Sequence, residues 1–268
     1  MIPAAFEYER ADSVDRAVEL LGSDEDAKLL AGGHSLIPLL RLRFARPSLL
    51  VDIGRLGDLR YVREDGDRIA IGALTRHAEV VHDPLLAKRC AIVARAAHLV
   101  GDPQVRHRGT IDGSIAHGDP ASDLATVLLT LDADLVARGP NGERTIPAAD
   151  FFRGPFETAL EHQEVLVEIR VPAAEGTYLK HQRRAHDWAT VGVAAARVDG
   201  DVNVGLASMG PTPLRAKGVE EAFAGGSSAT EAAERAAEGA DPPSDINGSS
   251  EYRAHLAQVL VGRALAQL

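Results

Sequence analysis

The segment Lys28-Leu29-Leu30-Ala31-Gly32-Gly33-His34-Ser35-Leu36 runs from a short apolar stretch through two glycines to a serine that can cap a helix. Its start predicts a buried strand, and the leucines after Ser35 predict a helix with Pro38 in its first turn. Glycines between a strand and a helix let backbone N–H groups approach an anion, so a pyrophosphate would fit there. Such turns are more often structural, and the Gly-x-Gly-x-x-Gly fingerprint is absent.

A second glycine-containing segment, residues 106–123, reads Arg-His-Arg-Gly-Thr-Ile-Asp-Gly-Ser-Ile-Ala-His-Gly-Asp-Pro-Ala-Ser-Asp. Most of it is expected to belong to a long polar loop over residues 101–121, and such loops usually have a function. Its hydroxyls can contact phosphates and the Asp123 carboxylate can accept from a ribose hydroxyl, although Ser122 and Asp123 also suit an ordinary helix start. The two segments fit one extended cofactor between two subdomains about as well as two unrelated turns.

The remaining pattern predicts βαβ-like alternation in the first part of the chain and a change of character after Pro172. The predicted elements are a helix capped by Ser13 and ended by Gly22, strands at residues 49–53 and 68–73, a helix capped by Thr75, one helix over residues 85–100, a helix after Ser122, strands at 133–137, 144–146 and 165–171, strands at 191–198 and 202–207, and alanine-rich helices thereafter. We therefore expect a domain boundary near residues 172–177.

Composition restricts the classes of function. A net charge of −10 without any Lys/Arg-rich block argues against a nucleic-acid partner or an anionic membrane surface. The single cysteine, Cys90, can form no internal disulfide and no multi-thiolate metal site. The N-terminus has no signal-peptide pattern and no stretch is long enough to span a bilayer, so we expect a cytoplasmic protein. The scattered histidines do not predict a metal site, and no hydrolase motif is present.

The motifs Ala31-Gly32-Gly33-His34-Ser35-Leu36 and Thr110-Ile111-Asp112-Gly113-Ser114 resemble the two FAD-binding motifs of molybdenum-hydroxylase flavoproteins. This family includes the medium subunit of carbon monoxide dehydrogenase and the FAD subunit of xanthine dehydrogenase, and the resemblance extends over nearly the whole chain. It implies an α+β fold: a two-subdomain FAD-binding domain of the vanillyl-alcohol-oxidase/PCMH type at 1–175, divided into about 1–56 and 57–175. A small α+β domain at 176–268 would follow, with a three-stranded sheet and helices.

The resemblance also implies which residues contact FAD. They are Lys28, Leu29, Leu30, Ala31, Gly32, Gly33, His34, Ser35 and Leu36 in the first segment, Gly109, Thr110, Asp112, Gly113, Ser114, Ala116, His117, Ser122 and Asp123 in the second, and Val165, Leu166, Lys180 and Trp188 beyond them. The N–H groups of residues 32–35 would be the principal donors to the diphosphate. Asp123 would accept from ribitol or ribose hydroxyls, Val165 and Leu166 would lie beside the adenine, and Lys180 would lie at the pyrimidine edge of the flavin.

Two positions carry alternatives. Trp188 either lies near the isoalloxazine or simply begins a strand and packs. Asp112 stands where the family usually has glycine, so its carboxylate must turn away from the phosphates or weaken binding. We expect Asp112 to take the backbone conformation of a glycine and to turn its carboxylate to solvent, to Arg106 or to Arg108.

The function implied by the resemblance is electron transfer within a heteromeric molybdenum hydroxylase. A partner subunit with [2Fe–2S] clusters would supply electrons, a large subunit would hold molybdopterin, and FAD would pass the electrons to an external acceptor. A dimer of heterotrimers is expected, and no residue of this chain needs to act as a catalytic acid or base. The alternatives are a stand-alone flavin oxidoreductase and an assembly subunit that has lost FAD.

Overall fold

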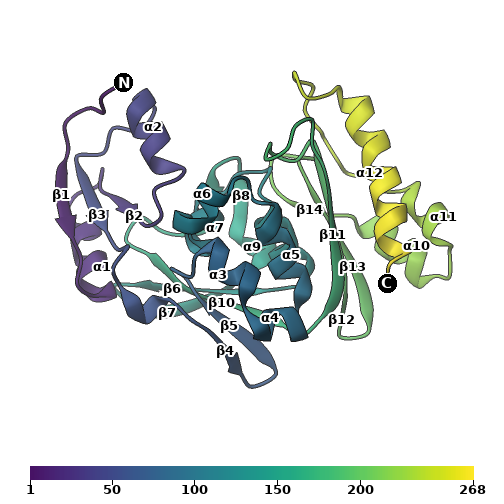
Figure 1. Ribbon diagram of the computed structural model, residues 1–268, viewed down its shortest axis with the longest axis horizontal. Coiled ribbons are helices and arrows are strands. Elements are labelled where there is room, and N and C mark those ends of the chain that lie inside the picture. Colours follow the sequence, from purple (N-terminus) through teal and green to yellow (C-terminus); the bar gives the residue numbers. More distant parts are fainter.

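The N-terminal lobe of the computed structural model, which describes residues 1–268, is a small parallel sheet with two helices (Figure 1). The strands β1 (Glu7–Arg10), β3 (Leu49–Asp52) and β2 (Lys28–Leu30) lie in this order. Helix α1 (Val14–Ser23) begins where Ser13 accepts a hydrogen bond from the Arg16 N–H, as predicted, and α2 (Leu36–Leu42) follows the glycines. This parallel β-α-β arrangement puts the end of β2 and the start of α2 at one edge of the lobe.

The middle lobe is a five-stranded antiparallel sheet covered by helices. A single 3-10 turn, η1 (Gly57–Leu59), connects it to the first lobe. Its strands, in sheet order, are β4 (Val62–Asp65), β5 (Arg68–Gly72), β10 (Val165–Pro172), β6 (Asp134–Gly139) and β7 (Gly142–Pro147). Its other elements are α3 (His77–His82), α4 (Pro84–Arg89), α5 (Ala91–Leu99), α6 (Pro103–Arg108), α7 (Ile111–His117), α8 (Asp123–Thr130), α9 (Ala148–Phe151), and the strands β8 (Phe152–Gly154) and β9 (Glu157–Thr158).

The C-terminal lobe is an antiparallel sheet buried on both faces. Its strands are β11 (Glu175–His181), β12 (Val191–Val198), β13 (Asp201–Ala207) and β14 (Leu214–Arg215), and its helices are α10 (Lys217–Ala224), α11 (Ala229–Ala233) and α12 (Ser250–Leu265). Along β12, Ala194 and Ala196 join the core of the middle lobe, whereas Val193 and Ala195 join the core beneath the C-terminal helices. The run of small apolar residues in β12 therefore fits a strand covered on both sides.

The structure corrects several expectations. The βαβ alternation stops at β3, because β5 belongs to an antiparallel sheet. The single helix predicted over residues 85–100 breaks at Cys90, whose non-helical backbone ends α4 and precedes α5. The predicted long loop over residues 101–121 contains α6 and α7, capped by Asp102 and Thr110. The short strand β14 extends the expected three-stranded C-terminal sheet to four.

Three further boundaries differ in detail. The helix predicted to start at Thr75 is capped by Arg76, because the Thr75 hydroxyl donates to the Tyr61 carbonyl. Helix α1 ends at Ser23 rather than Gly22. Ser35 precedes α2 without a side-chain capping bond. No helix has both the length and the apolar character needed to cross a membrane.

Two phenylalanines five positions apart allow a matched test of the middle-lobe core. Phe151 is completely buried, whereas Phe156 is 60% exposed. Phe151→Ala is expected to lower the free energy of unfolding by about 3–5 kcal/mol, because it removes a ring from a packed core and leaves a cavity. Phe156→Ala is expected to change it by about 0.5 kcal/mol or less. Urea denaturation followed by circular dichroism measures both, and equal losses would contradict this description of the core.

Candidate functional site

The two glycine segments lie directly against each other at the junction of the N-terminal and middle lobes. A Cβ atom at position 32 would overlap the carbonyl oxygen of Arg108 and would lie 2.8 Å from the Cα of Gly109. A Cβ at Gly113 would be 4.0 Å from the Cβ of Ala31. Only glycine permits the backbone approach at position 32. The structure therefore brings together the two segments that the sequence singled out, and we call this contact the glycine seam.

The first segment leaves a row of backbone donors free. The N–H groups of Gly32, Gly33, His34, Ser35 and Leu36 donate to no acceptor within the chain, and the first bonded amide is that of Ile37, which donates to the Gly33 carbonyl. Gly33 has a φ of +79°, a conformation that favours glycine. Consecutive free N–H groups at the start of a helix form an anion site, so this segment fits a diphosphate.

The second segment is different, because its amides are already bonded. The N–H groups of Ile111 and Asp112 donate to the carbonyls of Thr75 and Ala73, and those of Gly113 and Ser114 donate to the hydroxyl and carbonyl of Thr110. This segment therefore supplies a surface of small residues rather than a second row of donors. Among the hydroxyls, Ser114 and Ser122 face each other at 3.4 Å, while Thr110 donates to Asp112.

Asp112 does not behave as the sequence suggested. It lies in the first turn of α7 with ordinary helical backbone and is only 5% exposed, so the predicted glycine-like conformation is wrong. Its carboxylate accepts a 2.6 Å hydrogen bond from the Thr110 hydroxyl and contacts neither solvent nor the arginines. Burial raises the pKa of Asp112 to about 7, and the Thr110 hydroxyl and the Gly113 amide oppose this rise. The side chain is thus buried within the protein, with the Thr110 hydroxyl as its hydrogen-bond partner.

A cavity of about 220 Å³ opens beside the glycine seam. Its lining residues are Ala31, Gly32, Gly54, Arg55, Leu56, Gly57, Arg60, Leu74, Arg76, Arg108 and Thr110, which include four arginines and no acidic residue. The sequence analysis missed these arginines as a group. They come from three separate segments, so no local spacing could have revealed that they converge.

A buried ion pair joins the middle and C-terminal lobes. Lys180 Nζ lies 2.9 Å from Asp123 Oδ2, and their side chains are only 3% and 7% exposed. The Tyr178 hydroxyl donates to the other carboxylate oxygen at 2.6 Å, and Lys180 also donates to the Leu99 carbonyl. Burial raises the pKa of Asp123, while the Lys180 charge and the Tyr178 hydroxyl favour its ionised form. Two predicted site residues, Asp123 and Lys180, are thus brought into contact.

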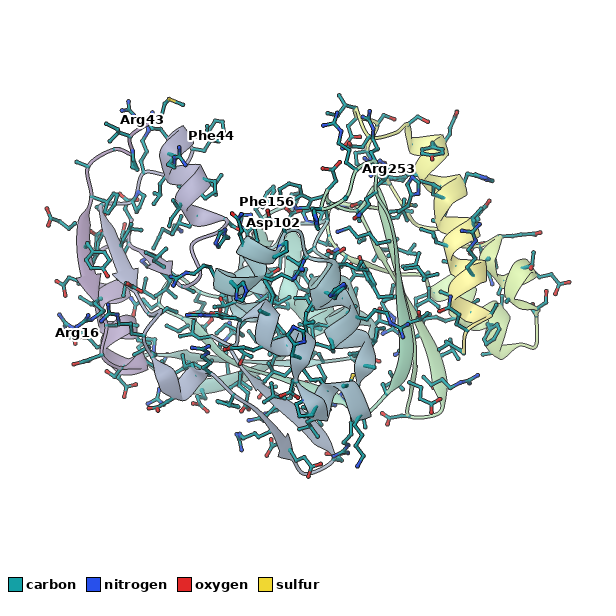
Figure 2. All side chains as sticks on the ribbon, in the orientation of Figure 1. Arg16, Arg43, Phe44, Asp102, Phe156 and Arg253 are labelled. Carbon is teal, nitrogen blue, oxygen red and sulfur yellow. The ribbon has the colours of Figure 1, made fainter.

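Other predicted positions are more scattered. Val165 and Leu166 are fully buried in β10, within two different hydrophobic clusters. Trp188 does not begin a strand: it is 70% exposed in the connection before β12, so the packing alternative is wrong. His117 lies 5.0 Å from the Phe156 ring, which Figure 2 shows with Asp102 at the upper edge of the middle lobe. Lys28, His34 and Ala116 are exposed.

The histidines offer no metal centre in this structure. No group of three or more His, Cys, Asp or Glu side chains is arranged to hold a metal ion. His77, behind the seam, is 3% exposed, and burial lowers its pKa to about 4, so it is a neutral core residue.

A helix preceded by free N–H groups, seated against a second glycine segment at a junction of lobes, defines a protein built to hold an extended anionic cofactor. Comparison with known proteins agrees with this class. Residues 4–174 match the model of the FAD-binding domain in molybdopterin dehydrogenase, and residues 176–268 match that of the CO dehydrogenase flavoprotein C-terminal domain. The chain therefore belongs to the family of FAD-binding medium chains of molybdenum-dependent dehydrogenases, which confirms the resemblance and the fold class expected from the sequence.

Individual relatives match over nearly their full length. The carbon monoxide dehydrogenase medium chain of Hydrogenophaga pseudoflava is 45% identical over 99% of this chain and 97% of that protein. The glyceraldehyde dehydrogenase medium chain of Sulfolobus acidocaldarius is 36% identical over the whole of both. One chain in the structure of carbon monoxide dehydrogenase from H. pseudoflava superposes with a TM-score of 0.94 at 43% identity, over 100% of this chain and 98% of that one.

The buried Asp112 makes stability depend on pH. Its folded-state pKa of about 7 lies above the ordinary value of 3.8, so the unfolded chain releases the proton first and the folded state loses stability as pH rises from about 4 to 7. Asp112→Asn removes the ionisable group. The free energy of unfolding of this variant, relative to that of the parent, is expected to increase by about 3 kcal/mol between pH 5 and pH 8. Denaturant titrations at both pH values measure it, and a constant offset would contradict the assigned titration.

The glycine seam gives a second matched pair. Gly32→Ala places a methyl group against the Arg108 carbonyl and is expected to lower the free energy of unfolding by about 1–3 kcal/mol. Gly57→Ala adds the same group where nothing lies within 4 Å, and it should be neutral within about 0.5 kcal/mol. If thermal denaturation finds the two variants equally stable, the close approach at position 32 is wrong.

Proposed function

We propose that this chain binds FAD along the glycine seam and passes electrons from [2Fe–2S] clusters of a partner subunit to an external acceptor. The observation that carries the proposal is the row of free N–H groups from Gly32 to Leu36. Each is a donor without an acceptor, and together they match the charge and length of a diphosphate. FAD supplies the redox chemistry, because it accepts electrons singly and releases them in pairs.

The residues of the chain then bind and orient the cofactor. The segment from Lys28 to Leu36 lies along the diphosphate, and Ser114 and Ser122 offer hydroxyls from the opposite side. The second segment contributes the close surface of Gly109, Thr110 and Gly113, with Ala116 and His117 beyond it. Asp112 supports this surface from inside through Thr110, so its charge stays out of the phosphate path.

The ion pair between Asp123 and Lys180 extends the site toward the C-terminal lobe. We propose that it meets the flavin end of FAD, with Lys180 stabilising negative charge at the pyrimidine edge. The exposed ring of Trp188 is available to stack on the isoalloxazine. Val165 and Leu166 support the adenine side from within the core. No acid or base is required, because electrons and not protons are handed between subunits.

The partners and the domain boundaries belong to the same proposal. Several relatives are medium chains or subunits of dehydrogenases or of a hydroxylase. We propose an iron–sulfur subunit and a molybdopterin-binding large subunit as partners, in a dimer of heterotrimers. Residues 1–175 would form the FAD-binding domain, with subdomains at about 1–56 and 57–175, and residues 176–268 the C-terminal domain. The lone cysteine fits a reducing compartment, the cytoplasm.

A substitution that removes one N–H tests the diphosphate site. His34→Pro deletes a single donor that makes no hydrogen bond within the chain, in the turn before α2, and His34→Ala keeps it. In the complex co-expressed with its partner subunits, the parent and His34→Ala are expected to hold about one FAD per chain. His34→Pro should bind FAD roughly 10- to 100-fold more weakly, since one charge-assisted hydrogen bond contributes about 1.5–3 kcal/mol.

The measurements are flavin absorbance after heat release and the dissociation constant from fluorescence quenching of the deflavinated complex. If His34→Ala loses as much affinity as His34→Pro, the imidazole and not the N–H row carries the contact. A fully assembled complex without flavin would contradict the proposed function and favour an assembly role.

A further inference from the structure

The cavity beside the glycine seam has an unusual charge distribution for an acidic protein. Of its four arginines, Arg60 pairs with Glu79, whose carboxylate also accepts a hydrogen bond from the Arg76 backbone N–H. The guanidinium groups of Arg55, Arg76 and Arg108 form no salt bridge. Elsewhere in the same lobe Arg63, Arg144 and Arg170 all pair with carboxylates. Three guanidinium groups without counter-charges converge here in a chain whose net charge is −10.

The clustered guanidinium groups repel one another, and no carboxylate lines the cavity to balance them. Partial burial and the nearby charges of Arg60 and Arg108 lower the pKa of Arg76. Two lining residues also have free backbone donors: the N–H groups of Arg55 and Gly57 donate to no acceptor within the chain. Guanidinium forks and free amides together are the groups that recognise phosphate oxygens.

The cavity is separate from most of the proposed flavin contacts. Only Ala31, Gly32 and Thr110 belong to both, and none of Gly33, Ser35, Ser114, Asp123 or Lys180 lines the cavity. At about 220 Å³ it is smaller than the 300–1,000 Å³ typical of pockets for drug-sized ligands, and it suits a single compact anionic group. Its walls come from both lobes: Arg55 precedes the η1 connection, and Arg76 and Arg108 belong to the middle lobe.

We propose that this cavity is a second anion site, which binds one phosphate group, either free inorganic phosphate or the phosphate of a nucleotide monoester. The bound phosphate would lie between Arg55, Arg76 and Arg108 and would bridge the N-terminal and middle lobes beside the glycine seam. Because Gly32 and Thr110 border both sites, phosphate here stabilises the wall on which the flavin diphosphate is proposed to rest. The proposed phosphate site is additional to the proposed FAD site, and the two sites share only the wall that includes Gly32 and Thr110.

Calorimetric titration of the complex with inorganic phosphate, at constant ionic strength set with chloride, tests the site. One saturable site per chain is expected, with binding at least ten-fold weaker in Arg76→Gln and in Arg108→Gln. Arg263→Gln, an exposed arginine on α12 outside the cavity, serves as the matched control and should bind like the parent. Titration with AMP distinguishes the sources: tighter binding than phosphate identifies a nucleotide monoester, and weaker binding identifies free phosphate.

The outcome for FAD is measured on the same samples. Phosphate binding that persists at full FAD occupancy supports a second anion site. Loss of phosphate binding in the FAD-loaded complex would show that the flavin phosphates fill the cavity, and this result would overturn the proposed second site. No saturable response, or an equal response in all three variants, also overturns it. Failure of the proposed function has a different signature, because phosphate would still bind to a complex that never takes up FAD.

Discussion

The candidate site depends on one backbone contact, the approach of Gly32 to the carbonyl of Arg108 and to Gly109. The N-terminal and middle lobes are also joined by the connection around η1 and by a hydrophobic cluster in which Leu21 of α1 packs with Val136 and Val165 of the middle sheet. The contact also holds the segment that precedes α2 beside the residues that precede α7. A Cβ at position 32 would overlap the Arg108 carbonyl, so the two segments could not approach each other as closely.

The C-terminal lobe is attached to the middle lobe mainly by apolar packing. Its sheet is apolar on both faces, and one face completes the core of the middle lobe. Within this apolar contact the Asp123–Lys180 pair is buried, with Tyr178 and the Leu99 carbonyl supplying further hydrogen bonds. A buried pair of this kind contributes little net stability, but losing either partner leaves an uncompensated charge. It therefore links β11 to the first turn of α8, at the end of the site where the flavin is proposed to lie.

Charge is distributed unevenly around the site. The chain is acidic, yet the lining of the cavity at the seam contains four arginines and no carboxylate, while burial raises the pKa of Asp112 to about 7, which partly reduces its negative charge near neutral pH. Both features raise the positive potential where phosphate groups are proposed to bind. An aspartate in a phosphate-binding motif is thus tolerated because helix α7 turns it into the interior, where Thr110 is its partner.

The sequence alone determined the family, the FAD-binding character and the α+β class, because two short motifs with local backbone geometry, a strand, glycines and a helix start, carry that information. It also gave the caps at Ser13 and Ser122, which depend on neighbouring residues only. The helices α6 and α7 lie within an expected loop although their caps, Asp102 and Thr110, are local residues. The sequence alone failed where the answer depends on contacts distant in the chain. The burial of Asp112, whose N–H donates to the distant Ala73 carbonyl, and the convergence of Arg55, Arg76 and Arg108 are decided by tertiary packing, since these groups lie in segments that no local pattern relates.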